Sequence, residues 1–485
     1  MVLAGLLAVF FICFVSRNHH LPWGDEVQTI DAAVNSYYGA GFRSMVYRNQ
    51  NDQKFWAGNV PLYGFVACLW TCVFGFSNAS VRVLNYMLLV LALLAVWLAV
   101  LRLQIIASAR QRLAMITVLL SGEGITYACM NLRYDAWSLL LCAAGLLFYT
   151  ASSGGVRAGG LFAIGVMMPL SGVHLPPYVL MLSAVFLLFL GWGVIRQLVP
   201  LYSGILLGIG SLFGLYWWKG VIPEFLAILH NEGGQSLGEK IQHLGYYFRP
   251  DRSLLCLVAL LLVLLLWRGR RPGGSVALRL GLAIGLGLPV ALFLMRRFVL
   301  SYAWAVYVPV VVCLFVVLVR EWRSFATARK AVVVAMLISA CGLGLPKTLA
   351  GMALQWSIRD YGIVERFVAG KIEHGAVVMC DPAAYFAIKP HALQVYTEQY
   401  EQVISAEERR SIQVLVIDPK DRTQFQATLG GNWAATGADL SVYPGPLPYI
   451  ISGIFHSRFG YRLAVYRRVD QLTSSPASPL PGADK

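Results

Sequence analysis

Two adjacent carboxylates, Asp25 and Glu26, stand near the beginning of the chain, directly after Gly24. A carboxylate within hydrogen-bond reach of a hydroxyl can take its proton while the oxygen attacks an electrophile. The pair also has a structural interpretation, because Asp25 followed by Gln28 three positions later has the form of a helix capping box. The spacing of these residues leaves both interpretations open.

Other charged residues occur within or beside apolar runs. Asp135 follows Arg133 at the head of such a run, where it either positions a substrate or forms an ion pair with Arg133. Glu123 lies inside an apolar run between two glycines, where an unpaired charge costs roughly 2.5 to 3.5 kcal/mol. It therefore requires a partner or a cavity.

The composition indicates that these residues belong to a membrane protein. Of 485 residues, 58% are hydrophobic and 13% charged, and the mean hydropathy is +0.64. The formal charge of +15 comes from arginines clustered between apolar runs, so it predicts membrane orientation and no nucleic-acid partner. Eight of the nine cysteines lie in apolar runs, and no disulfide framework is expected.

Apolar runs of about 20 residues, each long enough to cross a bilayer, predict an α-helical polytopic domain over residues 1–346 with about eleven spans. The spans are approximately residues 1–15, 81–101, 113–130, 134–150, 158–173, 176–195, 201–220, 254–267, 276–295, 299–319 and 331–346. The first run lacks a basic leader and a cleavage pattern, so we interpret it as an anchor.

The charges of the short loops predict the orientation of these spans. With a cytoplasmic N-terminus, every inner loop is basic, as the positive-inside rule requires. These loops carry Arg102, Arg110, Arg112, Arg157, Arg196, Arg268, Arg270, Arg271, Arg320, Arg323, Arg329 and Lys330. An odd number of spans then places loops 16–80 and 221–253, and everything after residue 346, outside. We expect the chemistry at that outer face.

The outer segments have elements of their own. Gly24-Asp25-Glu26 opens a segment with helical spacing of apolar residues from Val27 to Tyr37, and Gly39 ends it. This pattern predicts a short helix lying along the membrane surface, and residues 61–76 predict a second helix at the interface. Residues 347–472 predict a small α/β domain, because strand-like runs alternate with helical stretches such as Ser405-Ala406-Glu407-Glu408, which has the form of a capping box. The strand-like runs are residues 376–379, 414–417 and 463–466. Residues 473–485, rich in Ser and Pro, are predicted to be disordered.

The order of these motifs resembles the GT-C superfamily of membrane glycosyltransferases, and within it the lipid A aminoarabinose transferases and the protein O-mannosyltransferases. The matching motifs are Asp25-Glu26 in the first outer loop, Pro61-Leu62-Tyr63, Val81-Arg82-Val83-Leu84 at the start of the next span, and Leu132-Arg133-Tyr134-Asp135 at the head of the fourth. The resemblance covers residues 1–151 by motif, and the remainder by span count and the outer domain.

The resemblance implies a catalytic role for the acids. Asp25 matches the family's first-loop acid, which acts on the acceptor as a base, Glu26 matches the second acid, and Asp135 is placed to support them. The implied donor is a polyprenyl-phosphate sugar, since nucleotide sugars are absent outside the cytoplasm and the chain has no Walker motif. The implied acceptor is a lipid, glycan or protein. The implied location is a bacterial inner membrane with the site and the C-terminal domain in the periplasm.

Candidates for binding the donor come from both outer loops and from span ends. They are Lys54, Tyr63, Arg133, His230, His243, Arg296 and Arg297. Related aminoarabinose transferases have a lysine directly before the Pro-Pro of the first loop. Here Gly58-Asn59-Val60-Pro61 stands at that point, so Lys54 is the candidate substitute. The two arginines oppose the positive-inside trend, which favours phosphate binding over snorkelling to headgroups.

No tightly bound cofactor is expected. The sequence has no His-Glu-x-x-His, Cys-x-x-Cys or EF-hand pattern, so no dedicated metal site is predicted. A divalent ion bridging Asp25 or Glu26 to a phosphate is compatible with the sequence.

Two other classes of function remain as alternatives. A transporter or lipid flippase predicts inverted repeats and broken spans in matching halves, and no internal repeat is recognised in this sequence. A non-catalytic envelope scaffold leaves the first-loop acids and Arg297 without a role. The transferase is the preferred interpretation.

Overall fold

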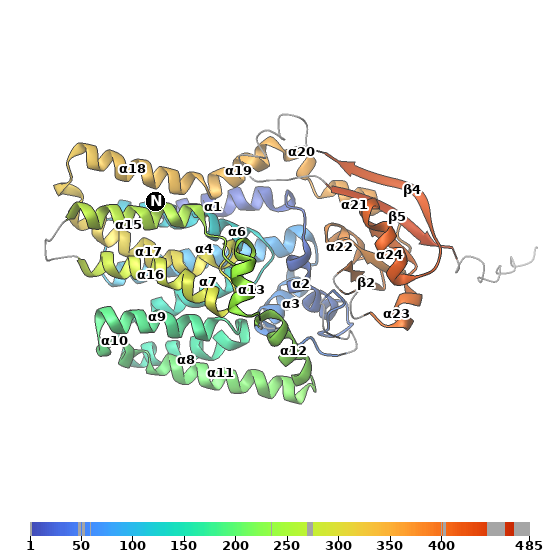
Figure 1. Ribbon diagram of the computed structural model, residues 1–485, viewed down its shortest axis with the longest axis horizontal. Helices are drawn as coiled ribbons and strands as arrows, with labels where there is room; N and C mark the ends of the chain where they lie inside the picture. Colours follow the sequence, from blue (N-terminus) through green and yellow to red (C-terminus); the bar gives the residue numbers. More distant parts are fainter. Residues whose placement is uncertain are drawn as a thin grey trace, which may run out of the picture.

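The structure is a computed structural model that describes residues 2–46, 50, 54–58, 60–233, 235–268, 275–398, 400, 404–443 and 461–469. A bundle of helices forms the larger part of the molecule, and a small α/β domain lies at one end of it (Figure 1). The predicted tail, residues 473–485, lies outside the described residues.

The bundle and its connections contain α1 (Val2–Val15), η1 (Ser16–Asn18), α2 (Gly24–Tyr37), α3 (Pro61–Phe74), α4 (Asn78–Arg102), α5 (Ala109–Ser121), α6 (Glu123–Met130), α7 (Asp135–Tyr149), α8 (Gly154–Ser171), α9 (Leu175–Leu190), α10 (Trp192–Gln197), α11 (Val199–Trp218), α12 (Ile222–Gly233), α13 (Leu237–Gln242), α14 (Leu244–Tyr247), α15 (Arg252–Arg268), α16 (Ser275–Met295), α17 (Leu300–Glu321), η2 (Trp322–Ser324), α18 (Thr327–Gly342) and α19 (Leu345–Leu354). The rest of the chain contains α20 (Trp356–Arg359), α21 (Gly362–Val368), β1 (Val377–Cys380), η3 (Pro382–Ala384), α22 (Tyr385–Ile388), β2 (Gln394–Thr397), α23 (Ala406–Ser411), β3 (Val414–Ile417), η5 (Pro419–Asp421), α24 (Arg422–Leu429), β4 (Trp433–Val442) and β5 (Tyr461–Arg468).

Several of these helices are long and apolar enough to cross a membrane. Within the described residues, five helices pass this test, namely α4, α8, α11, α16 and α17, and two bent pairs of helices raise the number to as many as seven. The chain is therefore a multi-pass membrane protein, but the predicted count of eleven spans is not confirmed. Helices α4 and α17 are the most buried of the five, so they form the centre of the bundle.

Two predicted spans are broken rather than continuous. The run predicted over residues 113–130 bends by 66° between α5 and α6, and α18 and α19 bend by 47°. The first break needs small residues, because a Cβ on Gly122 would lie 2.3 Å from the Tyr307 ring. A Cβ on Gly124 would lie 2.6 Å from the Asp251 carboxylate. These close approaches fix the bend at the point where Glu123 enters the site described below.

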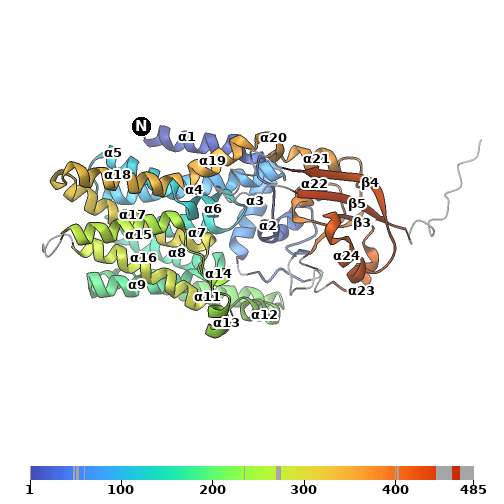
Figure 2. The same ribbon diagram turned by 45° about the horizontal axis from the view of Figure 1, so that its top comes forward.

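The segments predicted to lie outside are gathered at one end of the bundle. Helices α2 and α3 of the first loop and α12 and α13 of the second lie toward the same end as the C-terminal domain in both views (Figures 1 and 2). Helix α10, which carries Arg196, and the start of α18 lie at the opposite end (Figure 1). The cellular face that each end of the bundle meets stays a prediction.

The C-terminal domain is built on a five-stranded mixed sheet with the order β2-β1-β3-β5-β4. Strand β1 is parallel to β2 and β3, and β5 is antiparallel to β3 and β4. The central strands β1 and β3 are continuous apolar runs, as expected for strands covered on both faces. The predicted strands overlap β1, coincide with β3 and lie within β5. The predicted capping box is formed, with the Glu408 N–H donating to Ser405 Oγ at 3.2 Å.

This domain is attached to the first long loop, residues 16–80, by buried polar contacts on α2. Asp31 accepts hydrogen bonds from the Met45 N–H at 2.8 Å and from the Tyr385 hydroxyl, and Lys389 donates to the Asn35 amide oxygen. Burial raises the pKa of Asp31 against the opposing effect of Lys389, and burial lowers the pKa of Lys389. Helix α2, which begins beside Asp25, is therefore held between the bundle and the C-terminal domain.

Candidate active site

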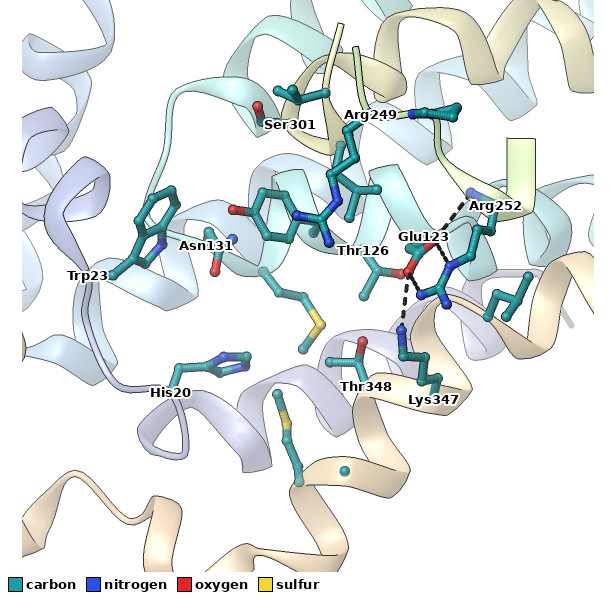
Figure 3. Close-up of a pocket in the computed structure, with 18 of the residues that line it drawn as sticks. His20, Trp23, Glu123, Thr126, Asn131, Arg249, Arg252, Ser301, Lys347 and Thr348 are labelled. Atoms are coloured by element: carbon teal, nitrogen blue, oxygen red, sulfur yellow. Dashed lines mark hydrogen bonds and ion pairs between the residues drawn. The ribbon is translucent and has the colours of Figure 1, made fainter. Parts of the chain in front are cut away.

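A cavity of about 870 Å³ lies where the first loop, the two helix breaks and the second loop meet. It is lined by His20, Trp23, Glu123, Thr126, Tyr127, Met130, Asn131, Gly245, Tyr246, Arg249, Pro250, Arg252, Arg297, Val299, Leu300, Ser301, Leu343, Lys347, Thr348, Gly351, Met352 and Arg359. Figure 3 shows two distinct ends, with Glu123, Arg252 and Lys347 at one and His20 and Trp23 at the other. The volume is in the range of small-molecule sites.

Positive charge dominates the lining. Of the lining residues in the described part of the chain, five are cationic and Glu123 is the single acid. The cations are Arg249, Arg252, Arg297, Lys347 and Arg359. Burial lowers the pKa of Arg359 only to about 10, so this side chain stays charged at neutral pH. A partly enclosed site with this excess of cations attracts anions such as phosphate.

Glu123 organises one end of the cavity. Its Oε1 lies 2.7 Å from Arg252 Nη2 and 3.2 Å from Lys347 Nζ. Arg249 extends into the cavity from the side opposite Lys347 (Figure 3). Glu123 thus pairs with two cations, Arg252 and Lys347, which supply the partner that the sequence required. These three residues and Arg249 all line the cavity.

The other end of the cavity is aromatic and polar. The Trp23 and Tyr127 rings are tilted toward each other with centroids 6.4 Å apart, and Asn131 lies beside them. His20 Nε2 is buried without a hydrogen-bond partner. Burial, followed by the nearby charges of Arg82 and Arg359, lowers the pKa of His20 well below its ordinary value, so its ring is neutral at pH 7. Such a surface suits the apolar face and hydroxyls of a sugar.

Asp25, Arg133 and Asp135 form one connected group. Arg133 donates through Nη1 to Asp25 and through Nε to Asp135 Oδ2 at 2.8 Å. The second Asp135 oxygen accepts from Trp304 Nε1 at 3.0 Å, so each oxygen of this buried carboxylate accepts a hydrogen bond. The Asp25 side chain is 35% exposed, and its hydrogen bond to Arg133 involves one oxygen. The ion pair between Arg133 and Asp135, one of the two alternatives for Asp135, is present, and Asp25 joins it.

The neighbouring acid, Glu26, has a different environment. It is completely buried, and its two oxygens lie 3.0 and 3.1 Å from the guanidinium nitrogens of Arg82. The backbone N–H groups of Leu132 and Trp23 donate to the same carboxylate at 2.7 and 3.2 Å. Glu26 therefore caps the start of α2 from the N3 position, as in a capping box. Its ion pair with Arg82 attaches that end of α2 to α4 of the bundle.

One other predicted residue, Tyr63, lies near this group without lining the cavity. Tyr63 donates to Asn85 at 2.9 Å, and Asn85 donates to the Arg133 carbonyl at 2.8 Å, so Tyr63 supports the turn that carries Arg133. The ring of Trp23, which does line the cavity, lies 5.9 Å from the Arg133 guanidinium. The Asp25 group thus borders the aromatic end of the cavity.

The remaining predicted donor residues are placed differently. Arg297 lines the cavity, and its Nη1 lies 3.4 Å from the Tyr246 hydroxyl, whereas Arg296 faces the Tyr302 ring at 6.0 Å. Lys54 forms an ion pair with Glu224 on α12. His230 and His243 are exposed and do not line the cavity.

Sequence reasoning did not select three of the cavity cations, Arg252, Lys347 and Arg359. Arg252 and Lys347 stand at span ends that are predicted to face outward, against the positive-inside trend. This departure from the positive-inside trend identified Arg297, and it could have identified Arg252 and Lys347 as well. Glu123 supplied a second signal, because a carboxylate inside an apolar run needs cationic partners. Within the described ranges, no three His, Cys, Asp or Glu side chains converge on a metal site.

Comparison with known proteins gives a fold but no sequence relative. Neither a protein-family model nor a curated protein matches the sequence. Crystal structures of ArnT from Cupriavidus metallidurans match with 14% identity in two states. The complex with undecaprenyl phosphate gives a TM-score of 0.59 over 95% of this chain and 97% of that one, and the apo state gives 0.60 over 98% and 100%. An oligosaccharyltransferase from Archaeoglobus fulgidus is a weaker match, with a TM-score of 0.45, 12% identity, and coverage of 88% of this chain and 70% of that one. The chain described here therefore has the same overall fold as ArnT.

Proposed function

We propose that this protein is a GT-C glycosyltransferase that moves a sugar from a polyprenyl-phosphate donor to an acceptor on a lipid, glycan or protein. The observation that carries the proposal is an accessible carboxylate, Asp25, at the border of a cavity that combines a cationic end with an aromatic end. The fold shared with ArnT, which was crystallised with undecaprenyl phosphate, supports a lipid-linked donor. We place the reaction at the periplasmic face of a bacterial inner membrane.

The cationic end of the cavity would bind the donor phosphate. Arg249 and Arg297 line the cavity without an ion pair to Glu123, while Arg252 and Lys347 are preorganised by that carboxylate. Guanidinium groups bind phosphate oxygens through two parallel hydrogen bonds. Cations fixed in place before the reaction also stabilise the charge that develops on a departing phosphate. This end therefore serves both binding and departure of the lipid phosphate.

The aromatic end would hold the sugar. The Trp23 and Tyr127 rings offer apolar faces, and the neutral His20 and Asn131 offer hydrogen-bonding atoms for hydroxyl groups. Trp23 is two residues from Asp25 in sequence and begins the same helix as its N-cap. In a donor bound in this direction, the anomeric carbon is bonded to the phosphate and lies between the cationic end and the rest of the sugar. The acceptor would attack the side of this carbon that is opposite the phosphate, which is the side turned toward Asp25.

Asp25 would act as the base. The ion pair with Arg133 orients its carboxylate, and Asp135, held by Trp304, orients Arg133. As the acceptor hydroxyl forms its bond to the anomeric carbon, the bond from that carbon to the phosphate oxygen breaks and the acceptor proton passes to Asp25. The electron pair leaves with the lipid phosphate, which needs no proton donor. Asp135 is a positioning residue in this scheme, and Glu26 is structural.

The test compares intact masses of lipid A, glycans and envelope proteins from cells that carry the wild-type protein, the Asp25→Asn variant or no copy of the gene. We expect one sugar-sized mass increment in the wild type that is lost in both other strains. The matched control is Glu373→Gln, an exposed carboxylate that pairs with Arg467 on the C-terminal domain, and this variant should keep the modification. A fully modified Asp25→Asn strain with normal amounts of protein in the membrane would reject the assignment of Asp25.

A further inference from the structure

Glu123 has a position that phosphate binding alone does not explain. It is the one acid among the described lining residues of a cavity that contains five cations, and it is 8% exposed. Its carboxylate occupies hydrogen-bond donors of Arg252 and Lys347, at 2.7 and 3.2 Å, that a phosphate would otherwise use. An anion in an anion site lowers affinity for the ligand, so its presence calls for a second function.

The reaction changes the charge of the lipid that occupies the cavity. This step of the argument rests on the proposed function. The donor is a phosphodiester with one negative charge, and the product lipid is a phosphomonoester with about −1.5 to −2 charges at pH 7. A purely cationic cavity would bind the product more tightly than the donor, because Coulomb attraction grows with ligand charge. Turnover would then be limited by product release.

We propose that the Glu123 carboxylate sets the preference of the cavity between donor and product, by repelling the extra negative charge of the product phosphate. Glu123 repels the monoester more than the diester because its repulsion scales with the charge of the ligand. It also keeps Arg252 and Lys347 in place for the singly charged donor. The carboxylate thereby lowers the affinity of the cavity for both phosphates, and it favours release of the lipid phosphate after transfer.

The geometry of the helix break supports a fixed role for this side chain. Glu123 is the first residue of α6, directly after the 66° bend, and the next N–H, that of Gly124, donates to Asp251 Oδ2 at 2.6 Å. Asp251 also accepts from Tyr307 at 2.7 Å, so the backbone on which Glu123 stands is anchored independently of its side chain. Substituting the Glu123 side chain should therefore change the charge of the cavity while the bend remains.

The experiment measures binding of two probes to the purified full-length protein. The probes are undecaprenyl phosphate, a monoester, and its methyl ester, a diester without a sugar that cannot react. The variant is Glu123→Gln, which retains an oxygen that Arg252 and Lys347 can reach. The matched control is Glu321→Gln, because Glu321 also pairs with an arginine, Arg268, but does not line the cavity.

We expect the affinity ratio of monoester to diester to rise about tenfold in Glu123→Gln at pH 7.5, the order expected for removing one charge roughly 6 to 8 Å from the ligand in a partly solvated site. The ratio should be unchanged in Glu321→Gln. At pH 5, where the monoester is mostly protonated to a single charge, the difference between the variant and the wild type should disappear. An unchanged ratio in a folded Glu123→Gln protein at pH 7.5 would overturn the inference.

A second variant distinguishes an electrostatic effect of Glu123 on the ligand from a role limited to holding Arg252 and Lys347 in place. The double substitution Glu123→Gln with Lys347→Gln returns the cavity to its original net charge, so its affinity ratio should return toward that of the wild type. If Glu123 were only a brace, the double variant would show no such return. A wild-type protein that binds neither probe would instead contradict the proposed function, so the two failures are distinguishable.

Discussion

Glu26→Gln tests the claim that two adjacent acids have opposite roles. Arg82 is fully buried and makes two of its side-chain hydrogen bonds to Glu26, at 3.0 and 3.1 Å. Glutamine has one carbonyl oxygen in place of two carboxylate oxygens, and its NH2 group would face N–H donors. Removing one partner of a buried ion pair costs about 3 to 5 kcal/mol. At about 1.5 °C per kcal/mol for a chain of this size, the midpoint of thermal unfolding should fall by roughly 4 to 8 °C.

The assay is thermal unfolding of the purified protein in detergent at a fixed scan rate, because large proteins commonly unfold irreversibly. Asp25→Asn is the matched control, since the residue is adjacent and partly exposed, and its partner Arg133 keeps Asp135. This control should unfold close to the wild type. The double variant Glu26→Gln with Arg82→Met should recover part of the loss, because no buried charge is then left unpaired.

Activity measurements complete this prediction. Glu26→Gln protein that remains folded should transfer sugar at a rate close to the wild type, whereas folded Asp25→Asn protein should be inactive. A Glu26→Gln protein with wild-type thermal stability but no activity would refute the reasoning, because it would assign chemistry to a carboxylate that the structure buries.

Three further predictions follow from single contacts. Arg297→Ala should raise the donor KM about tenfold in initial-rate measurements, while Arg296→Ala should change it by less than about twofold; equal effects would remove the cavity assignment. Lys389→Met should weaken the attachment of the C-terminal domain to α2 by about 1 to 3 kcal/mol, seen as faster hydrogen exchange in α2 and α22, and unchanged exchange would contradict it. Gly124→Ala should lower the unfolding temperature through overpacking worth about 1 to 3 kcal/mol, whereas Gly159→Ala, where a Cβ meets nothing within 4 Å, should not; similar temperatures for both would argue against a tightly packed bend.

The elements with strong local signals were predictable from the sequence. Helix α2 begins and ends where the apolar spacing and Gly39 indicated, with Gly39 at a φ of +79°. Strand β3 coincides with the predicted run of residues 414–417. The break between α5 and α6 was not predicted, because Gly122 and Gly124 read as part of an apolar run. Their bend depends on packing against residues more than 100 positions away, such as Tyr307.

The candidate site was also predictable only in part, because long-range packing decides which residues meet. Sequence identified Asp25 and Glu26 as a pair but had no means of separating them, since burial distinguishes the two. The partner that buries Glu26 is Arg82, 56 residues away. An arginine at the start of an apolar span requires a counterion, so this pairing was within reach of the sequence. The partners of Glu123 follow the same rule, but which cations approach it depends on how the spans pack.

The most direct test of the central claim is the level of polyprenyl-phosphate sugar in the lipids of cells that lack the protein, carry it, or carry Asp25→Asn. If Asp25 takes the acceptor proton during transfer from this donor, mass spectrometry should show the sugar-linked lipid accumulating in both the first and the third strain, with wild-type cells holding less. Equal levels of every polyprenyl-phosphate sugar in the three strains would contradict the account.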